Sequence, residues 1–103
     1  MTHHMSLRPL PFSQIRSGTK TVELRLRDEK RRRIQIGDRI TFTNTETGEQ
    51  LTVRVTALYP FDSFEELFHR LGTDCCGGPV DMDRYYSPQE QRRWGVLGIG
   101  IQR

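Results

Sequence analysis

Residues 39–59, RITFTNTETGEQLTVRVTALY, hold two runs in which apolar and polar side chains alternate, joined by a short polar segment. The alternate positions of these runs are apolar: Ile40, Phe42, Leu51, Val53, Val55, Ala57 and Tyr59. A period of two places them on one face of an extended chain, as in a strand with one buried face. Because a polar loop at 45–48 separates the runs, we expect 39–44 and 51–59 to form an antiparallel hairpin that Pro60 ends.

Upstream of this hairpin the sequence predicts two further strands with a helix between them. Residues 3–7 are compatible with a short first strand, and two prolines then precede a brief helix over 12–17. Gly18 stands where a left-handed residue commonly ends a helix. A strand over 20–27 follows, and the polar residues 28–33 are either a connection or a single helical turn.

Downstream of the hairpin the sequence predicts two short helices and an irregular loop. Ser63 and Glu66 form a capping box for a helix that carries apolar residues at i, i+3, i+4 and i+7 and ends at Gly72. Residues 73–82 are rich in glycine and lack periodicity, so we expect a loop there. A serine–proline pair and a closing glycine indicate a last helix within 87–95.

The final segment, 96–101, predicts a strand whose two faces differ in size. Leu97, Ile99 and Ile101 share one face, and Gly98 and Gly100 share the other, where another element can approach closely. Together the segments predict an α+β fold: a small, mostly antiparallel barrel of about five strands with two or three short helices. At 103 residues the chain fits one domain, 1–103.

Composition limits the classes of function. No apolar run approaches the roughly 18 residues of a membrane span, so we expect no membrane partner and a cytoplasmic location. The net charge is +3, but the first forty residues hold ten Lys/Arg against four Asp/Glu, whereas the remainder holds six against nine. Fourteen of the sixteen cations are arginine, which binds phosphate bidentately and stacks on bases, as in nucleic-acid surfaces.

Cysteine and histidine usage indicates neither a disulfide framework nor a metal site. Cys75 and Cys76 are adjacent, a spacing that cannot join distant segments, so we expect reduced thiols in the loop rather than a vicinal disulfide. The histidines are His3, His4 and His69, too few and too scattered for a typical zinc site. We expect no metal and no cofactor.

The segment 18–25, GTKTVELR, groups charges of both signs on a short strand. It carries Lys20, Glu23 and Arg25 close together, with Thr21 beside them. Such a grouping suits a cleft that grips a polar or anionic ligand. The alternative is an ion pair between Glu23 and Arg25 that only satisfies the sheet, but it leaves the lysine unexplained.

This segment resembles the GxKxxExR motif of the ASCH domain, the activating-signal-cointegrator homology domain, at all four fixed positions. Further stretches are similar to small bacterial ASCH proteins: Pro11–Phe12, Asp28–Arg32, Ile36–Asp38, Phe61–Leu67, Tyr85–Ser87 and Gly95–Ile99. The resemblance covers nearly the whole chain. It implies a β-barrel related to the PUA RNA-binding fold, with a cleft between barrel and helices bordered by the motif. Lys20 and Arg25 would contact phosphate or a base edge, and Glu23 would orient Lys20 or accept hydrogen bonds from a base.

The resemblance also implies two hydrolytic activities. Some ASCH-like proteins hydrolyse the amide of N4-acetylcytidine with a Lys and a Thr in this segment and a downstream Glu; Lys20 matches that Lys, but Glu23 occupies the position of the catalytic Thr. A water-activating mechanism with Glu23 as general base and Lys20 stabilising the anion would be the alternative. The downstream Glu could be Glu65, Glu66 or Glu90. Other ASCH-like proteins resemble ribonucleases specific for single strands.

Secondary features fit a nucleic-acid or nucleotide ligand. Four consecutive cations could contact phosphates, although such a run is usually a solvated face: Lys30, Arg31, Arg32 and Arg33. Tyr85 or Tyr86 could stack on a base, whereas Trp94 is more consistent with core packing. The sequence therefore favours a domain that binds RNA, a nucleotide or a nucleoside. A hydrolase acting on RNA or a modified nucleoside, and a protein-interaction domain using the 73–82 loop, are the alternatives.

Overall fold

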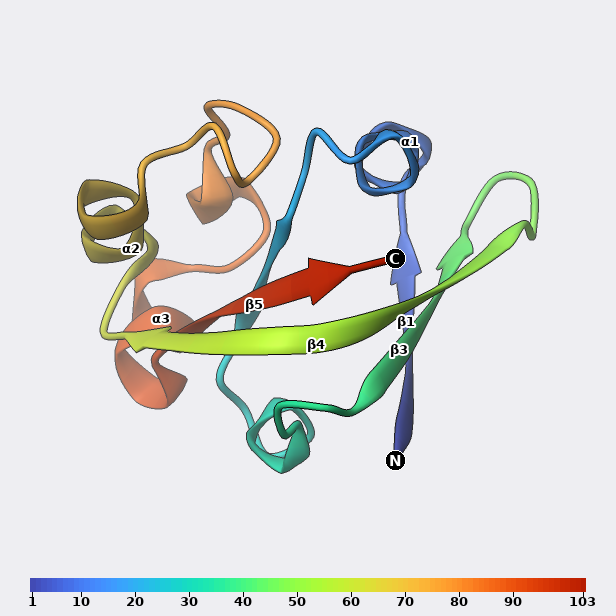
Figure 1. Ribbon diagram of the computed structural model, residues 1–103. Coiled ribbons are helices and arrows are strands. Elements are labelled where there is room, and N and C mark those ends of the chain that lie inside the picture. The colour runs from blue at the N-terminus through green and yellow to red at the C-terminus, as the bar shows by residue number, and fades with distance from the viewer.

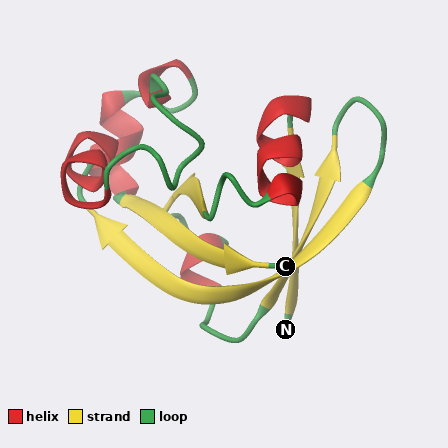
Figure 2. Cartoon of the chain, turned by 45° about the horizontal axis from the view of Figure 1, so that its top comes forward, coloured by secondary structure: helices red, strands yellow, loops and turns green.

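The computed structural model describes residues 1–103 and shows one sheet of five strands that curls into a half-barrel (Figure 1). In chain order the elements are β1 (Thr2–Leu7), α1 (Pro9–Ser17), β2 (Val22–Leu26), η1 (Arg31–Arg33), β3 (Arg39–Asn44), β4 (Gln50–Phe61), α2 (Phe64–Leu71), η2 (Met82–Arg84), α3 (Pro88–Trp94) and β5 (Val96–Gln102), where η marks a single turn of 3-10 helix. The strand order is β1-β3-β4-β5-β2. The predicted α+β class and barrel-like architecture are confirmed, and Figure 2 shows α1 apart from α2 and α3.

The strand pairings are mixed. The predicted hairpin is confirmed, with Phe42 opposite Leu51 in the antiparallel β3–β4 pair. The β4–β5 and β5–β2 pairs are also antiparallel, but β1 and β3 are parallel. This parallel pair was not expected, and it arises because α1, β2 and η1 together form a connection long enough to return the chain in the same direction.

Strand β4 differs from the prediction in its length and in its phase. It continues through Pro60 to Phe61, so the prediction that Pro60 ends it was wrong. By this point β4 has left its β3 partner and pairs with β5 alone, so a residue without an N–H is tolerated there. The register also shifts between Val55 and Ala57, and the bulge reverses the alternation. Leu58, rather than Tyr59, therefore packs against the core.

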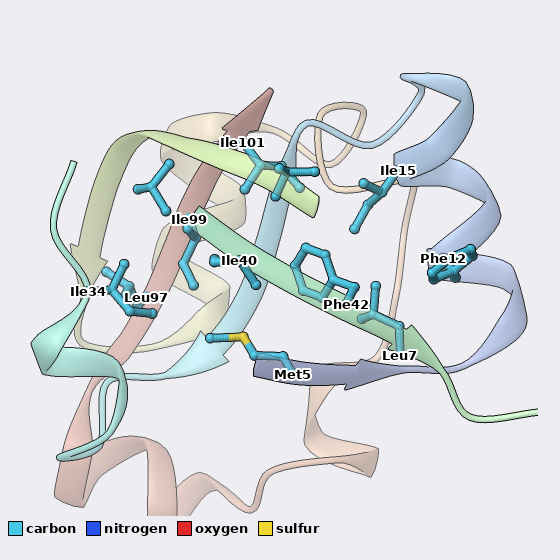
Figure 3. Packing of buried hydrophobic residues seen from close by; sticks show 12 residues of the cluster. Met5, Leu7, Phe12, Ile15, Ile34, Ile40, Phe42, Leu97, Ile99 and Ile101 are labelled. Carbon is cyan, nitrogen blue, oxygen red and sulfur yellow. The ribbon is translucent and has the colours of Figure 1, made fainter. Parts of the chain in front are cut away.

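The apolar residues form two buried clusters, one on each side of β5. Twelve residues fill the half-barrel, as Figure 3 shows: Met5, Leu7, Phe12, Ile15, Ile34, Ile40, Phe42, Val53, Val55, Leu97, Ile99 and Ile101. Eight form a second cluster: Val22, Leu24, Leu26, Phe64, Leu67, Cys76, Met82 and Val96. A side-chain carbon at Gly98 would lie 3.2 Å from a methyl of Leu67, which confirms that the missing side chain allows close approach.

The helices begin and end where local chemistry permits. Helix α1 begins at Pro9, earlier than predicted, and Gly18 follows it with φ of 85° in the left-handed region. Helices α2 and α3 agree with the prediction, although at Ser63 only the serine half of the capping box forms, whereas Ser87 and Glu90 form both halves. At nine, eight and seven residues, the α-helices are all too short to cross a bilayer.

Side chains, rather than backbone pairs, connect the two edge strands of the half-barrel. Arg25 of β2 donates from Nη2 to the carbonyl oxygen of Ser6 in β1 at 2.9 Å. Lys30 donates from Nζ to the carbonyl oxygen of His4 at 3.2 Å. Two alternate carbonyls of β1 thus accept from cations, one in β2 and one in the turn between β2 and η1. The seam between β1 and β2 is therefore polar, and Arg25 belongs both to the seam and to the site described next.

Candidate functional site

A cleft of about 340 Å³ opens at the end of this seam where Arg25 contacts Ser6, between α1, β2 and the segment from Cys76 to Tyr86. Its volume lies within the range of roughly 300–1,000 Å³ that is usual for small-molecule sites. The charged residues that line it are Arg8, Lys20, Glu23 and Arg25. These give the cleft a local charge of +2, so it favours an anionic ligand.

The floor of the cleft is a buried triad in which one carboxylate joins two cations. Lys20 Nζ lies 2.9 Å from Glu23 Oε1, and Arg25 Nη2 lies 2.9 Å from Glu23 Oε2. The three side chains are only 9%, 3% and 13% exposed, in the order Lys20, Glu23, Arg25. The grouping predicted from residues 18–25 is therefore present, and it carries a net charge of +1 in a poorly solvated place.

The triad depends on a break in the strand at Thr21. Had the strand begun at Lys20, as predicted, Lys20 and Glu23 would have pointed to opposite faces. Strand β2 instead begins at Val22, and the main-chain N–H groups of Thr21 and Val22 both donate to the carbonyl oxygen of Cys75. Glu23 pairs in register with Ile99, so its side chain enters the half-barrel, and the break lets Lys20 reach it there.

The environment of Glu23 keeps it ionised. Burial by itself would raise its pKa, but the charges of Lys20 and Arg25, with hydrogen bonds from Lys20 and from the Leu24 N–H, outweigh burial and leave the pKa below its usual value. Both oxygens are occupied: Oε1 by Lys20 and the Leu24 N–H, and Oε2 by Nε and Nη2 of Arg25. A carboxylate held in this way orients the cations well but is a poor general base.

The 73–82 loop forms one wall of the cleft and is fastened to α1 and β2. Gln14 of α1 donates from Nε2 to the carbonyl oxygen of Gly77 at 2.9 Å, and Lys20 and Cys76 form an isolated antiparallel bridge. The Cys75 and Cys76 sulfurs are 3.8 Å apart as free thiols. Burial, followed by the neighbouring Cys75, raises the pKa of Cys76 to about 12, so Cys76 is a neutral packing group.

The mouth of the cleft is apolar and exposed. Leu10 is 68% exposed, Tyr85 47% and Val80 38%, although all three are large hydrophobic residues. The guanidinium of Arg8 lies over the Tyr85 ring, 5.4 Å from its centroid, while Tyr86 is held by stacking on Phe64. A cationic floor beneath an apolar, aromatic mouth matches a ligand that has a charged group and a flat apolar body.

The remaining predicted site residues lie outside this cleft. Thr21 does not line it, and its side chain is exposed. The four-cation run lies at the opposite end of the half-barrel, in and beside η1 (Figure 1), and three of its members have separate partners. Arg31 pairs with Asp28 at 2.9 Å, Lys30 contacts β1, and Arg32 donates to the carbonyl oxygen of Arg27.

Sequence reasoning missed the apolar residues of the mouth, Leu10 and Val80, and two polar cleft residues, Arg8 and Gln14. Neither of these two polar residues carried a recognisable motif, although Arg8 precedes the predicted first helix and Gln14 lies within it, and this helix borders the motif segment. In addition, no group of three or more His, Cys, Asp or Glu side chains is arranged to hold a metal ion. The charged groups of the cleft are three cations and one carboxylate, and the rest of its lining is apolar or neutral polar.

Comparison with known families decides the classification. The ASCH domain family matches residues 5–103. The chain belongs to the ASCH domain family. The triad of this ASCH domain is formed by the three charged positions of the GxKxxExR motif, and the glycine of the motif is the residue that follows α1.

Solved structures agree with this assignment. The hypothetical protein PH0355 is 31% identical, with a TM-score of 0.88 over 99% of this ASCH domain and 98% of its own chain. The protein PF0455 from Pyrococcus furiosus is 33% identical, with a TM-score of 0.77 over 99% and 96%. ASCH from Zymomonas mobilis is 22% identical, with a TM-score of 0.62 over 99% and 67%, and shares the fold. The comparison with curated proteins gave no match.

Proposed function

We propose that this ASCH domain binds a nucleotide, either free or as a unit of RNA, in the cleft between α1, β2 and the 73–82 loop. The observation that carries the proposal is the buried triad, because Glu23 holds Lys20 and Arg25 side by side beneath an open cleft. Two cations fixed in this way lose little side-chain entropy on binding phosphate, because folding has already ordered them.

The charge and polarity of the walls favour a nucleotide over inorganic phosphate or a simple carboxylate. The local charge of +2 balances a phosphate group, which carries about −1.5 to −2 at neutral pH. The exposed ring of Tyr85 and the apolar side chains of Leu10 and Val80 supply a surface on which a base can stack. The phosphate would lie at Lys20 and Arg25, and the base toward the mouth.

The hydrolase alternative receives less support. The state of Glu23, ionised and bonded at both oxygens, disfavours the water-activating mechanism in which it acts as base. Glu23 also occupies the position at which the amidohydrolase-like relatives have their catalytic Thr, so that hydroxyl group is missing here. Incubation of the protein with RNA and with N4-acetylcytidine, beside a Lys20→Ala variant, tests this alternative. If the wild type forms product and Lys20→Ala does not, the cleft is a catalytic site and the proposal of binding alone is wrong.

Calorimetric titration with nucleoside 5′-monophosphates and the matching nucleosides tests the proposal. We expect the monophosphates to bind more tightly, and Lys20→Met to weaken their binding about 10- to 150-fold, since a hydrogen bond to a charged group contributes about 1.5–3 kcal/mol. Lys30→Met is the matched control, because Lys30 is the chain's other lysine and lies outside the cleft. Equal loss in both variants would contradict the proposal.

A second variant keeps the test valid if Lys20→Met impairs folding. Tyr85 is half-exposed at the mouth, so Tyr85→Ala should leave the fold intact. Stacking of one base on an aromatic ring contributes about 1–3 kcal/mol, and we expect affinity for the monophosphates to fall accordingly, by about 5- to 150-fold. Monophosphate binding that is insensitive to Tyr85→Ala would place the ligand elsewhere.

A further inference from the structure

A second hollow, which shares no residue with the cleft, lies at the other end of β2 and contains four arginines. It has a volume of about 570 Å³ and is bordered by the ends of β2, β4 and α3 and by η1. The arginines come from three separate parts of the chain: Arg27, Arg32, Arg92 and Arg93. We refer to these four residues as the arginine groove.

The arginine groove has little compensating negative charge. None of its four arginines forms an ion pair with a carboxylate, and the one acidic residue that lines the hollow, Asp62, forms no ion pair either. By contrast, Arg16 pairs with Glu49 at 2.8 Å, and Arg31 pairs with Asp28. Four unneutralised guanidinium groups around one carboxylate leave the hollow with a local charge of +3, which attracts polyanions.

Two of the arginines are held in place by contacts that leave donors free. Arg32 donates from Nε to the carbonyl oxygen of Arg27 at 2.8 Å and from Nη2 to that of Trp94 at 3.4 Å. The guanidinium of Arg93 lies over the Trp94 ring, 4.9 Å from its centroid. A guanidinium has five N–H donors, so Arg32, which uses two of them, keeps donors for a ligand, and a cation–π contact holds Arg93.

We infer that the arginine groove is a binding site for the phosphate backbone of single-stranded RNA, so that the ligand of the cleft is one unit of a longer strand. The inference rests on the proposed function for the choice of RNA. Arginine suits phosphodiesters because its fork donates two parallel hydrogen bonds, and the Trp94 ring beside the Arg93 guanidinium places an aromatic group in the same hollow, where an unpaired base can stack. Strand β2 links the two sites: Glu23 and Arg27 are four residues apart, about 13 Å along a strand.

The direct test measures binding of a fluorescent twelve-nucleotide oligouridylate by anisotropy over a range of salt concentrations. In the variant Arg27→Gln/Arg92→Gln/Arg93→Gln we expect weaker binding. We also expect the slope of log affinity against log salt to fall by about 2, because each phosphate contact on a single strand contributes about 0.7. Affinity for a nucleoside monophosphate, which occupies the cleft alone, should not change.

The matched control removes the same charge elsewhere. Arg39→Gln/Arg54→Gln/Arg70→Gln lowers the net charge equally at residues outside the groove and the cleft. If this variant lowers the salt slope as much as the groove variant does, the effect is one of net charge and the inference is overturned. Polyglutamate that competes with RNA as well as polyuridylate does would also overturn it, because the groove would then take an acidic protein segment.

The two proposals fail separately. If the groove variant binds RNA as the wild type does while Lys20→Met still loses monophosphate binding, the inference about the arginine groove is wrong. The proposal that the cleft binds a nucleotide then still stands. If the groove variant binds RNA more weakly but the wild type binds no monophosphate, RNA binding by the arginine groove is supported. The proposal that the cleft binds a nucleotide is then wrong. Arg27, Arg92 and Arg93 are exposed, so the groove variant should fold normally, which circular dichroism can verify.

Discussion

Replacing Glu23 by glutamine removes one charge from the triad without changing the shape of the side chain. The carboxylate is 3% exposed, and it accepts from Lys20 at 2.9 Å, from Arg25 Nη2 and Nε at 2.9 and 3.0 Å, and from the Leu24 N–H at 3.1 Å. Glu23→Gln would leave two buried cations facing one another without a counter-charge. The glutamine amide would also place N–H groups where one of the cations now donates.

The expected cost is large for a single isosteric substitution. Removing one partner of a buried ion pair costs about 3–5 kcal/mol, and we expect the lower end, about 3 kcal/mol, because glutamine retains one acceptor oxygen. For a chain of this size each kcal/mol changes the melting temperature by roughly 4–8 °C, so Tm should fall by about 12–24 °C. Urea unfolding followed by circular dichroism, and thermal melts, measure both quantities.

Glu49→Gln is the control for the loss of a carboxylate. Glu49 also accepts two hydrogen bonds from an arginine, Arg16, but the two side chains are about half exposed. An exposed pair contributes about 0–1 kcal/mol, so this variant should differ little from the wild type. If Glu23→Gln and Glu49→Gln lost the same stability, the triad would not be the buried, mutually dependent unit described above.

A second measurement connects the same variant to binding. Without the negative charge of Glu23, the cations Lys20 and Arg25 remain at the floor of the cleft, so an added anion should replace the missing carboxylate. We expect millimolar phosphate to restore more stability to Glu23→Gln than it adds to the wild type, by mass action on the folded state. Equal effects of phosphate on both proteins would contradict the placement of the anion beside these cations.

Two further predictions concern the cleft wall and the N-terminal strand. At Gly77 (φ +92°) a Cβ would lie 2.6 Å from Gln14 Oε1, whereas at Gly78 (φ +103°) it would meet nothing within 4 Å. Gly78→Ala should therefore cost only left-handed strain, about 1–2 kcal/mol, and Gly77→Ala about 1 kcal/mol more, a difference that should vanish in a Gln14→Ala background. Asp38 accepts hydrogen bonds from His3 and from the Gln35 N–H, which lower its pKa from 3.8 to about 2. Because the folded pKa is depressed, this stabilisation is present above about pH 4 and is lost as pH falls toward 2, so Asp38→Asn should flatten the fall in unfolding free energy in that range; an unchanged pH profile would refute the assignment.

Most of the local structure could be predicted from the sequence, because its causes are local. The alternation of β3 and the first half of β4, the apolar spacing of α2 and the glycine after each α-helix all act over a few residues. The errors come from strand pairing between distant segments, which leaves no local pattern in the sequence. The bulge near Thr56 reverses the phase of β4, and Pro60 is tolerated only because β3 no longer accompanies β4 there.

The sequence by itself determined the main strands and helices, through their periodicity, and one short motif predicted that Lys20, Glu23 and Arg25 lie close together. Only the tertiary structure decided how the charges are used. The Cys75 carbonyl breaks the strand so that Lys20 reaches Glu23, and the seam between β1 and β2 gives Arg25 its partner in Ser6. Likewise, α3 brings its arginines to η1, joined by a hydrogen bond between residues 62 apart. Contacts between residues so far apart in the sequence depend on how the sheet curls and on which strand edges remain unpaired. Neither property can be predicted from the spacing of residues in a short segment.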